Sequence, residues 1–453
     1  MTRQQNQSLP KVKIPNAREK LTMTRRSNRP RTGTFVALDI GTSKVCCLIA
    51  QVDRPAVENG ANFNVQPRVI GSGLQLNAGL KNGVIVDLDV AETAIRKAVF
   101  SAEEMANDRI TSVTVNINGG KPLSSTIGID VEIGGLQIDD ADLQQAFQKS
   151  LSIGENGTPR TDRQLIHSIP TGYKVDGNRG IRDPRGMYGE QLSVSMHLIT
   201  ALNGVVRTLQ NVVEQCHLEI DDFVIGPYAS GLSTLVQDET DLGVTVIDMG
   251  AGTTSIAVFT DGEMVFTDII PVGGGHVTND IARGLSTPVT HAERLKTLHG
   301  AAMVSDEDDH ELIDVLPVGE DEHNSPNHIP RSLLNGIIQP RIEETFELVR
   351  ERLTDSGLDQ IAGRRVVLTG GASQLQGIRE VAPIILDKQV RMGRPLRLRG
   401  LAESMSGPAF ATSAGLIAFA VGDHSTDLTA TGFTRRETTG LGSRIGSWIN
   451  EHL

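Results

Sequence analysis

The chain has 453 residues, enough for two or more domains, and 38% of them are hydrophobic, as is typical of soluble folded proteins. Its formal net charge of −12 argues against a nucleic-acid-binding protein. Cys46, Cys47 and Cys216 form no metal-binding pattern and suit a reducing cytoplasm. The sequence shows no secretory signal, and no stretch approaches the roughly 20 apolar residues that span a bilayer.

The first 33 residues are basic and contain three prolines. They hold nine Lys or Arg against one Glu and have little apolar periodicity, which predicts a disordered arm. Two interpretations of this arm stay open. It is an inert solvated tail, or it is attracted to an anionic membrane surface or an acidic partner.

A short phrase first occurs at Asp39-Ile-Gly-Thr-Ser-Lys and occurs again at Asp248-Met-Gly-Ala-Gly-Thr-Thr. Each copy lies between two runs of β-type residues, so two hairpins are predicted; in Rossmann and P-loop motifs a helix follows the glycines instead. Such turns present N–H groups and hydroxyls to an anion, and an Asp at the end of the incoming strand can hold a hydrated divalent cation. We therefore expect two similar halves that grip one nucleotide phosphate chain.

Between the two hairpins, helical and strand patterns alternate. The segment from about 110 to 172 mixes both and resembles a small inserted subdomain. The predicted elements are helices at 89–106, 140–150, 205–216 and 229–236, and strands at 111–118 and 223–225.

Beyond the second hairpin, a helical run at 277–284 follows Gly274 and Gly275. The acidic stretch 306–311 is predicted to be a solvated loop. A proline-rich connection then enters a long helix at 341–353, whose apolar residues have helical spacing. After it, a strand ends on Gly370-Gly371-Ala372, and residues 411–421 are predicted to form a buried helix.

The last 32 residues divide into a polar segment and an apolar stripe. Residues 422–440 predict a flexible tether with a reach on the order of 25 Å. One helical face after it carries apolar residues at i, i+4, i+7 and i+8: Leu441, Ile445, Trp448 and Ile449. A helix docked on the body is the alternative, but a docked helix has little need of a tether. We expect this helix to bind a membrane surface, weakly for a single copy.

The order of these elements resembles the superfamily of actin, heat-shock chaperone and sugar-kinase ATPases. The set comprises the two hairpins, the small residues at 226–230, the spacing of Glu293 and Lys296, and the glycines after strand 366–369. Finer matches, Val366-Val-Leu-Thr-Gly-Gly and Gly446-Ser-Trp-Ile, resemble the FtsA family of bacterial cell-division proteins. This resemblance covers residues 34–453.

The resemblance implies an α/β fold, the two-lobed actin-like (ribonuclease H-like) ATPase fold, with a relocated inserted subdomain and a C-terminal amphipathic helix. It implies the following division: a first lobe core of 34–86, 173–226 and 400–421; an inserted subdomain at 87–172; a second lobe core of 227–278 and 341–399; and a subdomain at 279–340 that binds the C-terminal peptide of FtsZ.

The resemblance also implies an ATP site with Mg²⁺. Asp39 and Asp248 would orient the hydrated cation, and Asp248 is the candidate catalytic residue. Glu293 and Lys296 would flank the adenine and ribose. The remaining candidate nucleotide contacts are Gly41, Thr42, Ser43, Lys44, Gly250, Gly252, Thr253, Thr254, Gly274, Gly275, Gly370, Gly371 and Ala372. Arg331 and Asn335 are candidate contacts for the FtsZ peptide.

Hydrolysis is expected to be slow at most. Hydrolysing actins place Gln or Glu where this chain has Gly226-Pro227, so no side chain there can orient the attacking water. The implied function is a polymerising adaptor that anchors the FtsZ ring to the cytoplasmic face of the inner membrane at the division site. Its partners would be FtsZ, further copies of itself, the membrane surface and other division proteins bound through the inserted subdomain, but no nucleic acid. The alternatives are a PilM-like pilus adaptor and a sugar-kinase-type phosphotransferase; a chaperone would need a substrate-binding domain that this chain lacks.

Overall fold

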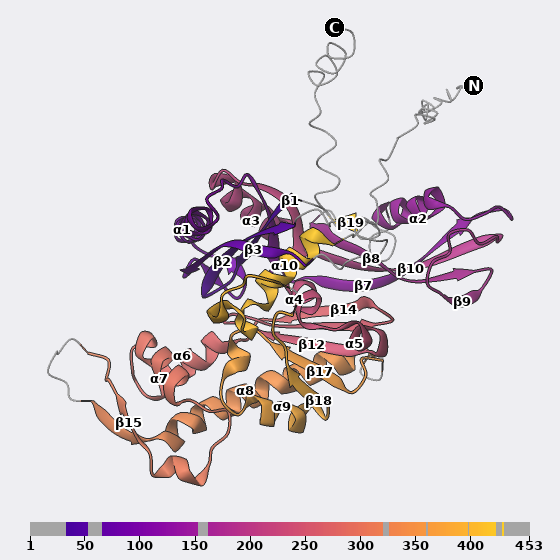
Figure 1. The fold of residues 1–453 in the computed structure, drawn as a ribbon. Coiled ribbons are helices and arrows are strands. Elements are labelled where there is room, and N and C mark those ends of the chain that lie inside the picture. The colour runs from indigo at the N-terminus through magenta and orange to yellow at the C-terminus, as the bar shows by residue number, and fades with distance from the viewer. Residues whose placement is uncertain are drawn as a thin grey trace, which may run out of the picture.

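Two sheets of identical topology organise the protein. The structure is a computed structural model that describes residues 33–52, 66–152, 162–319, 326–358, 361–396, 398–422 and 428–429. The strand order is β3-β2-β1-β6-β11 in the first sheet and β14-β13-β12-β17-β18 in the second. In both, the first three strands of this order are antiparallel to one another and the rest run parallel. The predicted pair of similar halves, and with it the two-lobed α/β fold, is confirmed (Figure 1).

The central strands of both sheets are buried on both faces, and their residues are therefore mostly apolar on both faces. The first sheet comprises β1 (Gly33–Ile40), β2 (Lys44–Val52), β3 (Arg68–Leu76), β6 (Ser112–Ile117) and β11 (Glu219–Ile225). The second comprises β12 (Val244–Met249), β13 (Thr254–Thr260), β14 (Glu263–Ile270), β17 (Arg365–Thr369) and β18 (Gln389–Met392).

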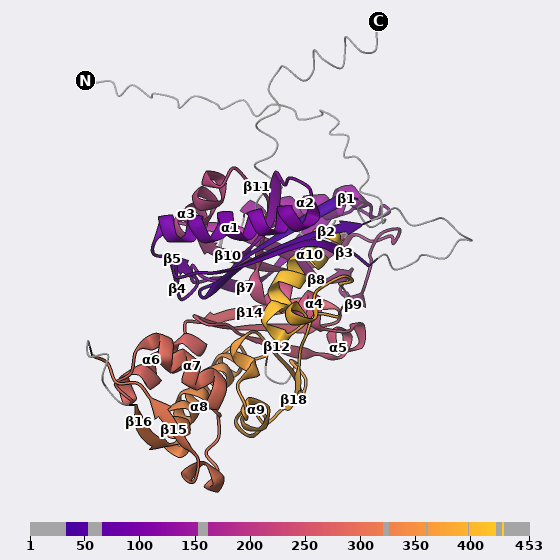
Figure 2. The same cartoon turned by 60° about the vertical axis from the view of Figure 1, so that its left-hand side comes forward.

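Two short helices, α4 (Gly226–Thr234) and α10 (Ala411–Val421), lie between the two sheets (Figure 2). All residues of α10 except Ala418 are buried, which confirms the predicted buried helix. The two helices cross closely at Gly415, where a Cβ atom would lie 1.7 Å from the carbonyl oxygen of Ala229. Only glycine permits this crossing.

The other helices and short elements surround the sheets. In the first lobe these are α1 (Leu88–Ala106), α3 (Asn203–Gln215), β4 (Leu80–Lys81) and β5 (Val84–Ile85). In the second they are α5 (Gln237–Leu242), α6 (Gly274–Gly284), α7 (Val289–His299), α8 (Arg331–Asp355), α9 (Ile378–Leu386), β15 (Leu312–Val315) and β16 (Asn327–Pro330). Single 3₁₀ turns form at Asp306–Asp309, Ala372–Gln374, Glu403–Met405 and Pro408–Phe410.

A third sheet with its own apolar core forms the inserted subdomain. Its elements are β7 (Leu123–Glu132), α2 (Asp140–Ser152), β8 (Arg163–Val175), β9 (Asn178–Ile181) and β10 (Gln191–Leu202). The expected range 87–172 differs from this at both ends. Helix α1 and strand β6 belong to the first lobe, because β6 pairs with β1 and α1 packs on β2 and β3. Strand β10, at the other end, pairs with both β7 and β8.

Helix α8 begins ten residues earlier than predicted, and Pro340 lies inside it. The expected proline-rich connection is therefore wrong at this point. A proline inside a helix removes one backbone hydrogen bond. The buried residues Leu334 and Ile338 continue the apolar face of Ile342 and Phe346 upstream, and their burial offsets that loss.

Two further expectations are corrected. The acidic stretch is not wholly solvated, because Asp308 is 4% exposed. Two residues of the predicted tether, Leu428–Thr429, form β19, which pairs with β8, while residues 423–427 and 430–440 lie outside the described residues. The basic arm up to residue 32 and the predicted membrane helix, with Leu441, Ile445, Trp448 and Ile449, lie outside the described residues. Among the helices that the structure describes, none has the length and apolar character needed to cross a bilayer.

Candidate functional site

The turns of the two predicted hairpins meet between the lobes. In each turn the first glycine donates its N–H to a carbonyl three residues on, from Gly41 to Lys44 and from Gly250 to Thr253. A Cβ atom on Gly252 would lie 2.4 Å from the hydroxyl of Thr42. The fold thus brings the two Gly/Thr turns, which are some 200 residues apart in the sequence, into contact with each other.

The two aspartates precede these turns, one in each lobe. Asp39 is 7% exposed; its Oδ1 accepts a hydrogen bond from Asn116 Nδ2 at 2.7 Å and its Oδ2 accepts one from Ser413 at 2.8 Å. Asp248 Oδ2 accepts hydrogen bonds from the hydroxyls of Ser230 and Thr412. Burial raises the pKa of both carboxyl groups, that of Asp39 to about 6, against the lowering effect of Lys44.

Sequence reasoning missed all four hydrogen-bond donors to these carboxylates: Asn116, Ser230, Thr412 and Ser413. The sequence did contain a pattern that indicates burial of these residues, since each is a polar residue within or beside an apolar run. Such residues need a buried partner. Their spacing from Asp39 and Asp248 gave no indication of which partner they would find.

Lys44 lies at the end of the first turn but is held by the C-terminal segment. Its Nζ donates to the carbonyl of Ala409 at 2.6 Å and lies 3.7 Å from the centre of the Phe410 ring. This cation–π contact and hydrogen bond fix the ammonium group near both carboxylates, where it favours their ionised forms.

The stability of the cation-free protein is expected to fall as pH rises through 6. Because the pKa of Asp39 is raised from 3.8 to about 6 in the folded state, its contribution to the free energy of unfolding is fully present below pH 3.8 and is lost as pH rises through 6. The full contribution is on the order of 3 kcal/mol. Denaturant unfolding in EDTA, compared at about pH 4 and pH 7, should show this loss in the wild type and a smaller one in Asp39→Asn. Identical pH dependence in both proteins would contradict it.

The candidate adenosine residues also come together. Lys296 Nζ donates to Glu293 Oε2 at 2.7 Å, to the hydroxyl of Thr278 at 2.8 Å and to the carbonyl of Gly274 at 3.1 Å. A Cβ atom on Gly274 would lie 2.9 Å from that of Ala372. Helices α6 and α7 and the turn after β17 therefore converge, and Thr278 is a member that the sequence did not indicate.

Two predicted nucleotide contacts, Gly370 and Thr254, lie beside the end of the strand that carries Asp248. Gly370 has φ +88°, and a Cβ atom there would lie 2.3 Å from Asp248 Oδ1, so the backbone approaches the carboxylate as only glycine allows. The hydroxyl of Thr254 is fully buried, so it is not accessible to a ligand in this structure. Gly273 N–H, in contrast, donates to His276 Nδ1, so this histidine is used in local structure.

No group of three or more His, Cys, Asp or Glu side chains that could hold a metal occurs in the described part of the chain. Mg²⁺ in nucleotide sites keeps several waters and is bound by one or two carboxylates plus phosphates. Asp39 and Asp248 provide such a pair of carboxylates.

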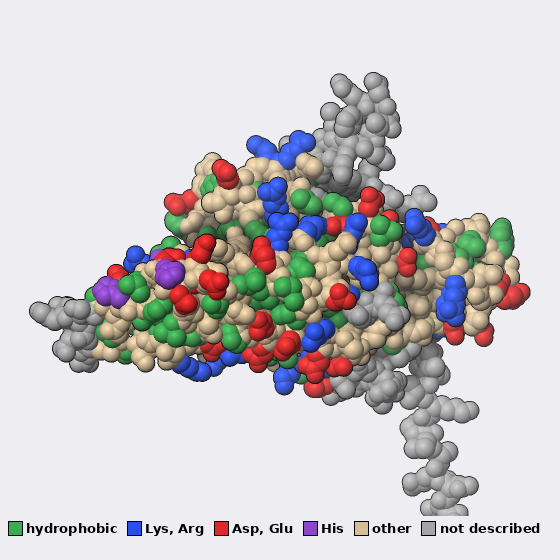
Figure 3. Space-filling model, turned by 90° about the horizontal axis from the view of Figure 1, so that it is seen from below, with side chains coloured by type: hydrophobic (Ala, Val, Ile, Leu, Met, Phe, Trp, Pro, Cys, Tyr) green, Lys and Arg blue, Asp and Glu red, His purple; other side chains and the backbone are tan. Residues whose placement is uncertain are grey.

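The candidate partner contacts Arg331 and Asn335 are used inside the protein. Asn335 is fully buried; it donates to Asp308 and accepts a hydrogen bond from Ala301 N–H, so its expected contact with a peptide is wrong. Arg331 pairs with Glu311 and donates to the carbonyl of His299. Leu298, Leu312 and Leu333 are exposed apolar side chains of the same subdomain. Figure 3 shows hydrophobic, acidic and histidine side chains together at this narrow end of the molecule.

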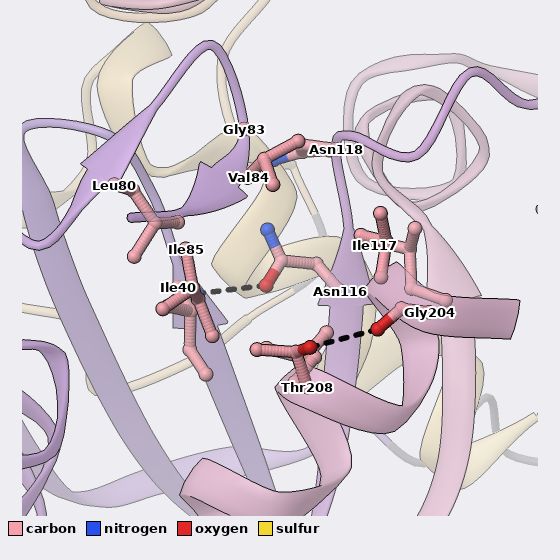
Figure 4. Close-up of a pocket in the computed structure, with 12 residues that line it drawn as sticks. Ile40, Leu80, Gly83, Val84, Ile85, Asn116, Ile117, Asn118, Gly204 and Thr208 are labelled. Carbon is pink, nitrogen blue, oxygen red and sulfur yellow. Dashed lines mark hydrogen bonds between the residues drawn. The ribbon is translucent and has the colours of Figure 1, made fainter. Parts of the chain in front are cut away.

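A cavity of about 300 Å³ lies behind the first turn (Figure 4). Its lining includes Ile40, Asn116 and Gly83. Asn116 accepts a hydrogen bond from Ile40 N–H, and Gly83 N–H donates to the hydroxyl of Thr42. The cavity wall thus includes residues that support the first turn and Asp39.

Two family models match the chain: "Cell division protein FtsA" over residues 245–415 and "SHS2 domain inserted in FTSA" over residues 119–200. The second range agrees with the inserted sheet. The chain is 44% identical to the cell division protein FtsA of Rhizobium meliloti (strain 1021), over 93% of this chain and 95% of that protein. It is 32% identical to that of Escherichia coli (strain K12), over 92% and 98%.

Solved structures of the same fold include a PilM-PilN type IV pilus biogenesis complex, with a TM-score of 0.60 and 16% identity over 86% of this chain and 99% of that one. MreB5 of Spiroplasma citri bound to ADP has a TM-score of 0.50 and 15% identity, over 86% and 97%. At such identities the likeness concerns the fold alone.

Proposed function

Because this chain belongs to the FtsA family of cell-division proteins, we propose that it is an ATP-binding, polymerising adaptor that anchors the FtsZ ring to the membrane. The observation that carries the nucleotide part is the meeting of two Gly/Thr turns, each preceded by an aspartate, from two sheets of identical topology.

The residues that would hold the nucleotide follow from this geometry. The N–H groups of Gly41 and Gly250 are used within their own turns, so the other backbone N–H groups and the hydroxyls of 42–44 and 251–253 would bind the phosphates. Asp39 and Asp248 would orient the waters of Mg²⁺. Glu293 and Lys296 would contact the ribose and adenine. Magnesium would neutralise phosphate charge when bound.

Slow hydrolysis, at most, is supported by the start of α4. Gly226 has no side chain, and a Cβ atom there would lie 1.7 Å from Asn118 Oδ1, so a water-orienting residue would first have to displace the Asn118 side chain. Orienting the attacking water is a large part of phosphoryl-transfer catalysis. The site suits a protein that retains ATP and uses it to stabilise an assembly.

Partner binding is assigned to the subdomain around β15, β16 and the start of α8. Leu298, Leu312 and Leu333 are 61%, 64% and 51% exposed there, and they offer apolar surface to a partner. An amphipathic peptide such as the FtsZ tail would cover them. The inserted subdomain would serve contacts with other division proteins.

The pilus-adaptor and sugar-kinase alternatives have less support. The relatives in sequence, at 32% to 44% identity, are cell division proteins, whereas the pilus complex shares 16% identity and the fold. A coupled assay that detected rapid phosphoryl transfer to a small acceptor would favour the kinase alternative.

Membrane attachment is tested by co-sedimentation with anionic liposomes in ATP and Mg²⁺. We expect the full chain to sediment with them and a chain without residues 441–453 to stay in the supernatant, because that segment carries the apolar stripe. Replacing Trp448 alone by Ser is expected to reduce binding partly. Unchanged sedimentation of the truncated chain would overturn the anchor, and failure of the attached protein to recruit FtsZ would overturn the adaptor.

A further inference from the structure

Two neighbouring hydroxyls in the first turn of α10 reach carboxylates of different lobes. Thr412 Oγ1 donates to Asp248 Oδ2 at 2.9 Å, and Ser413 Oγ donates to Asp39 Oδ2 at 2.8 Å. The two donors are 8% and 0% exposed. Successive residues of a helix point about 100° apart, which lets one turn face both sheets at once.

Packing alone gives no reason for hydroxyls at these positions. The rest of α10 is Ala, Gly, Leu, Ile, Phe and Val, and its neighbour Ser233 bonds only to backbone carbonyls, those of Ser230 and Ala411. A buried hydroxyl without a partner is costly, so the partners decide the residue type. Each of the two hydroxyls donates to an aspartate of the candidate cation site, and that of Thr412 also lies 3.0 Å from the hydroxyl of Ser230, which bonds the same carboxylate.

We infer that Thr412 and Ser413 are positioning residues that clasp the two aspartates and set their orientation toward a single cation between the lobes. The inference rests on the proposed nucleotide site and deepens it. Each hydroxyl fixes one carboxylate rotamer by a hydrogen bond to Oδ2, and Ser230 adds a second to Asp248. Because one helical turn carries both donors, a shift of one lobe against the other strains or breaks one of the two bonds.

The test measures the affinity of the full chain for a fluorescent ATP analogue in Mg²⁺ and in EDTA. The ratio of the two affinities isolates the cation-dependent part. Thr412→Val and Ser413→Ala are each expected to lower this ratio about 10-fold, the effect of losing a hydrogen bond to a charged group. Thr412→Ser keeps the hydroxyl and should retain the wild-type ratio.

Ser233→Ala is the matched control, since it removes a buried hydroxyl from the same α4–α10 contact that touches neither aspartate. It should leave the ratio unchanged even if its thermal stability falls. If Ser413→Ala is insoluble, the comparison of Thr412→Val with Thr412→Ser still tests the inference. Val copies the shape of Thr without its hydroxyl, and Ser keeps the hydroxyl.

A wild-type ratio in Thr412→Val and Ser413→Ala, or an equal loss in Ser233→Ala, would overturn the clasp. Wild-type binding that is the same in Mg²⁺ and EDTA would overturn it while leaving nucleotide binding intact. A wild type that binds no nucleotide at all would overturn the proposed function and the clasp with it.

Discussion

Asp248→Asn is expected to lower the affinity of the protein for Mg-ATP by about 100-fold, close to 3 kcal/mol of binding free energy. Asp248 is the only carboxylate that the second hairpin offers beside its turn, and its partner Asp39 lies in the other lobe. Without it, the cation would lose its link to the second lobe. The neutral amide can still accept the hydrogen bonds from Ser230 and Thr412 through its oxygen.

Folding should survive this substitution. Burial raises the pKa of Asp248, which means that the ionised carboxylate is disfavoured in the cation-free protein, and an amide removes that penalty. Isothermal titration with Mg-ATP measures the affinity, and denaturant unfolding in EDTA measures the stability. Asp261→Asn, at the exposed tip between β13 and β14, is the matched control and should change neither. Equal Mg-ATP affinity in Asp248→Asn and the wild type would remove Asp248 from the site.

Gly415→Ala is expected to destabilise the fold by about 3 kcal/mol or more. The added Cβ would lie 1.7 Å from the carbonyl oxygen of Ala229, and also close to the backbone carbon of that residue. Backbone atoms cannot rotate away as a side chain can. Helices α4 and α10 would have to separate, and with them the layer that joins the two sheets.

Gly336→Ala provides the same chemical change without the clash. Gly336 lies inside α8, is exposed and has space for a Cβ atom. Since Ala is favoured over Gly in helix interiors by up to about 1 kcal/mol, this variant should be unchanged or slightly stabilised. Urea unfolding of both variants measures the difference. Similar midpoints for the two variants would mean that the α4–α10 crossing is not close in solution.

The hairpins could be predicted because their information is local. A β-run, a Gly/Thr turn and a second β-run lie within some 20 residues, and strand periodicity excludes the helix of other glycine loops. The similarity of the two halves was predicted from the repeat of that phrase. Helix 411–421 was equally clear from an apolar stretch bounded by polar residues.

The limits of the inserted subdomain could not be predicted in the same way. Strand β6 and strand β7 have similar patterns, and only their pairing distinguishes them: β6 joins β1, and β7 joins β10. Asn335 was misassigned for a related reason. Its position on α8 is compatible with exposure, and only the packing of Asp308 and Ala301 over it decides its burial.

The sequence by itself indicated the two Gly/Thr hairpins and the aspartate before each turn, because each hairpin depends on residues close together in the chain, and the repeat of the phrase predicted two similar halves. The tertiary structure alone decided what holds those aspartates. Asn116 comes from β6, Ser230 from α4, and Thr412 and Ser413 from α10, far along the chain from the carboxylates that they bond. A buried hydroxyl requires a hydrogen-bond partner, but only the tertiary structure decides which residue supplies it.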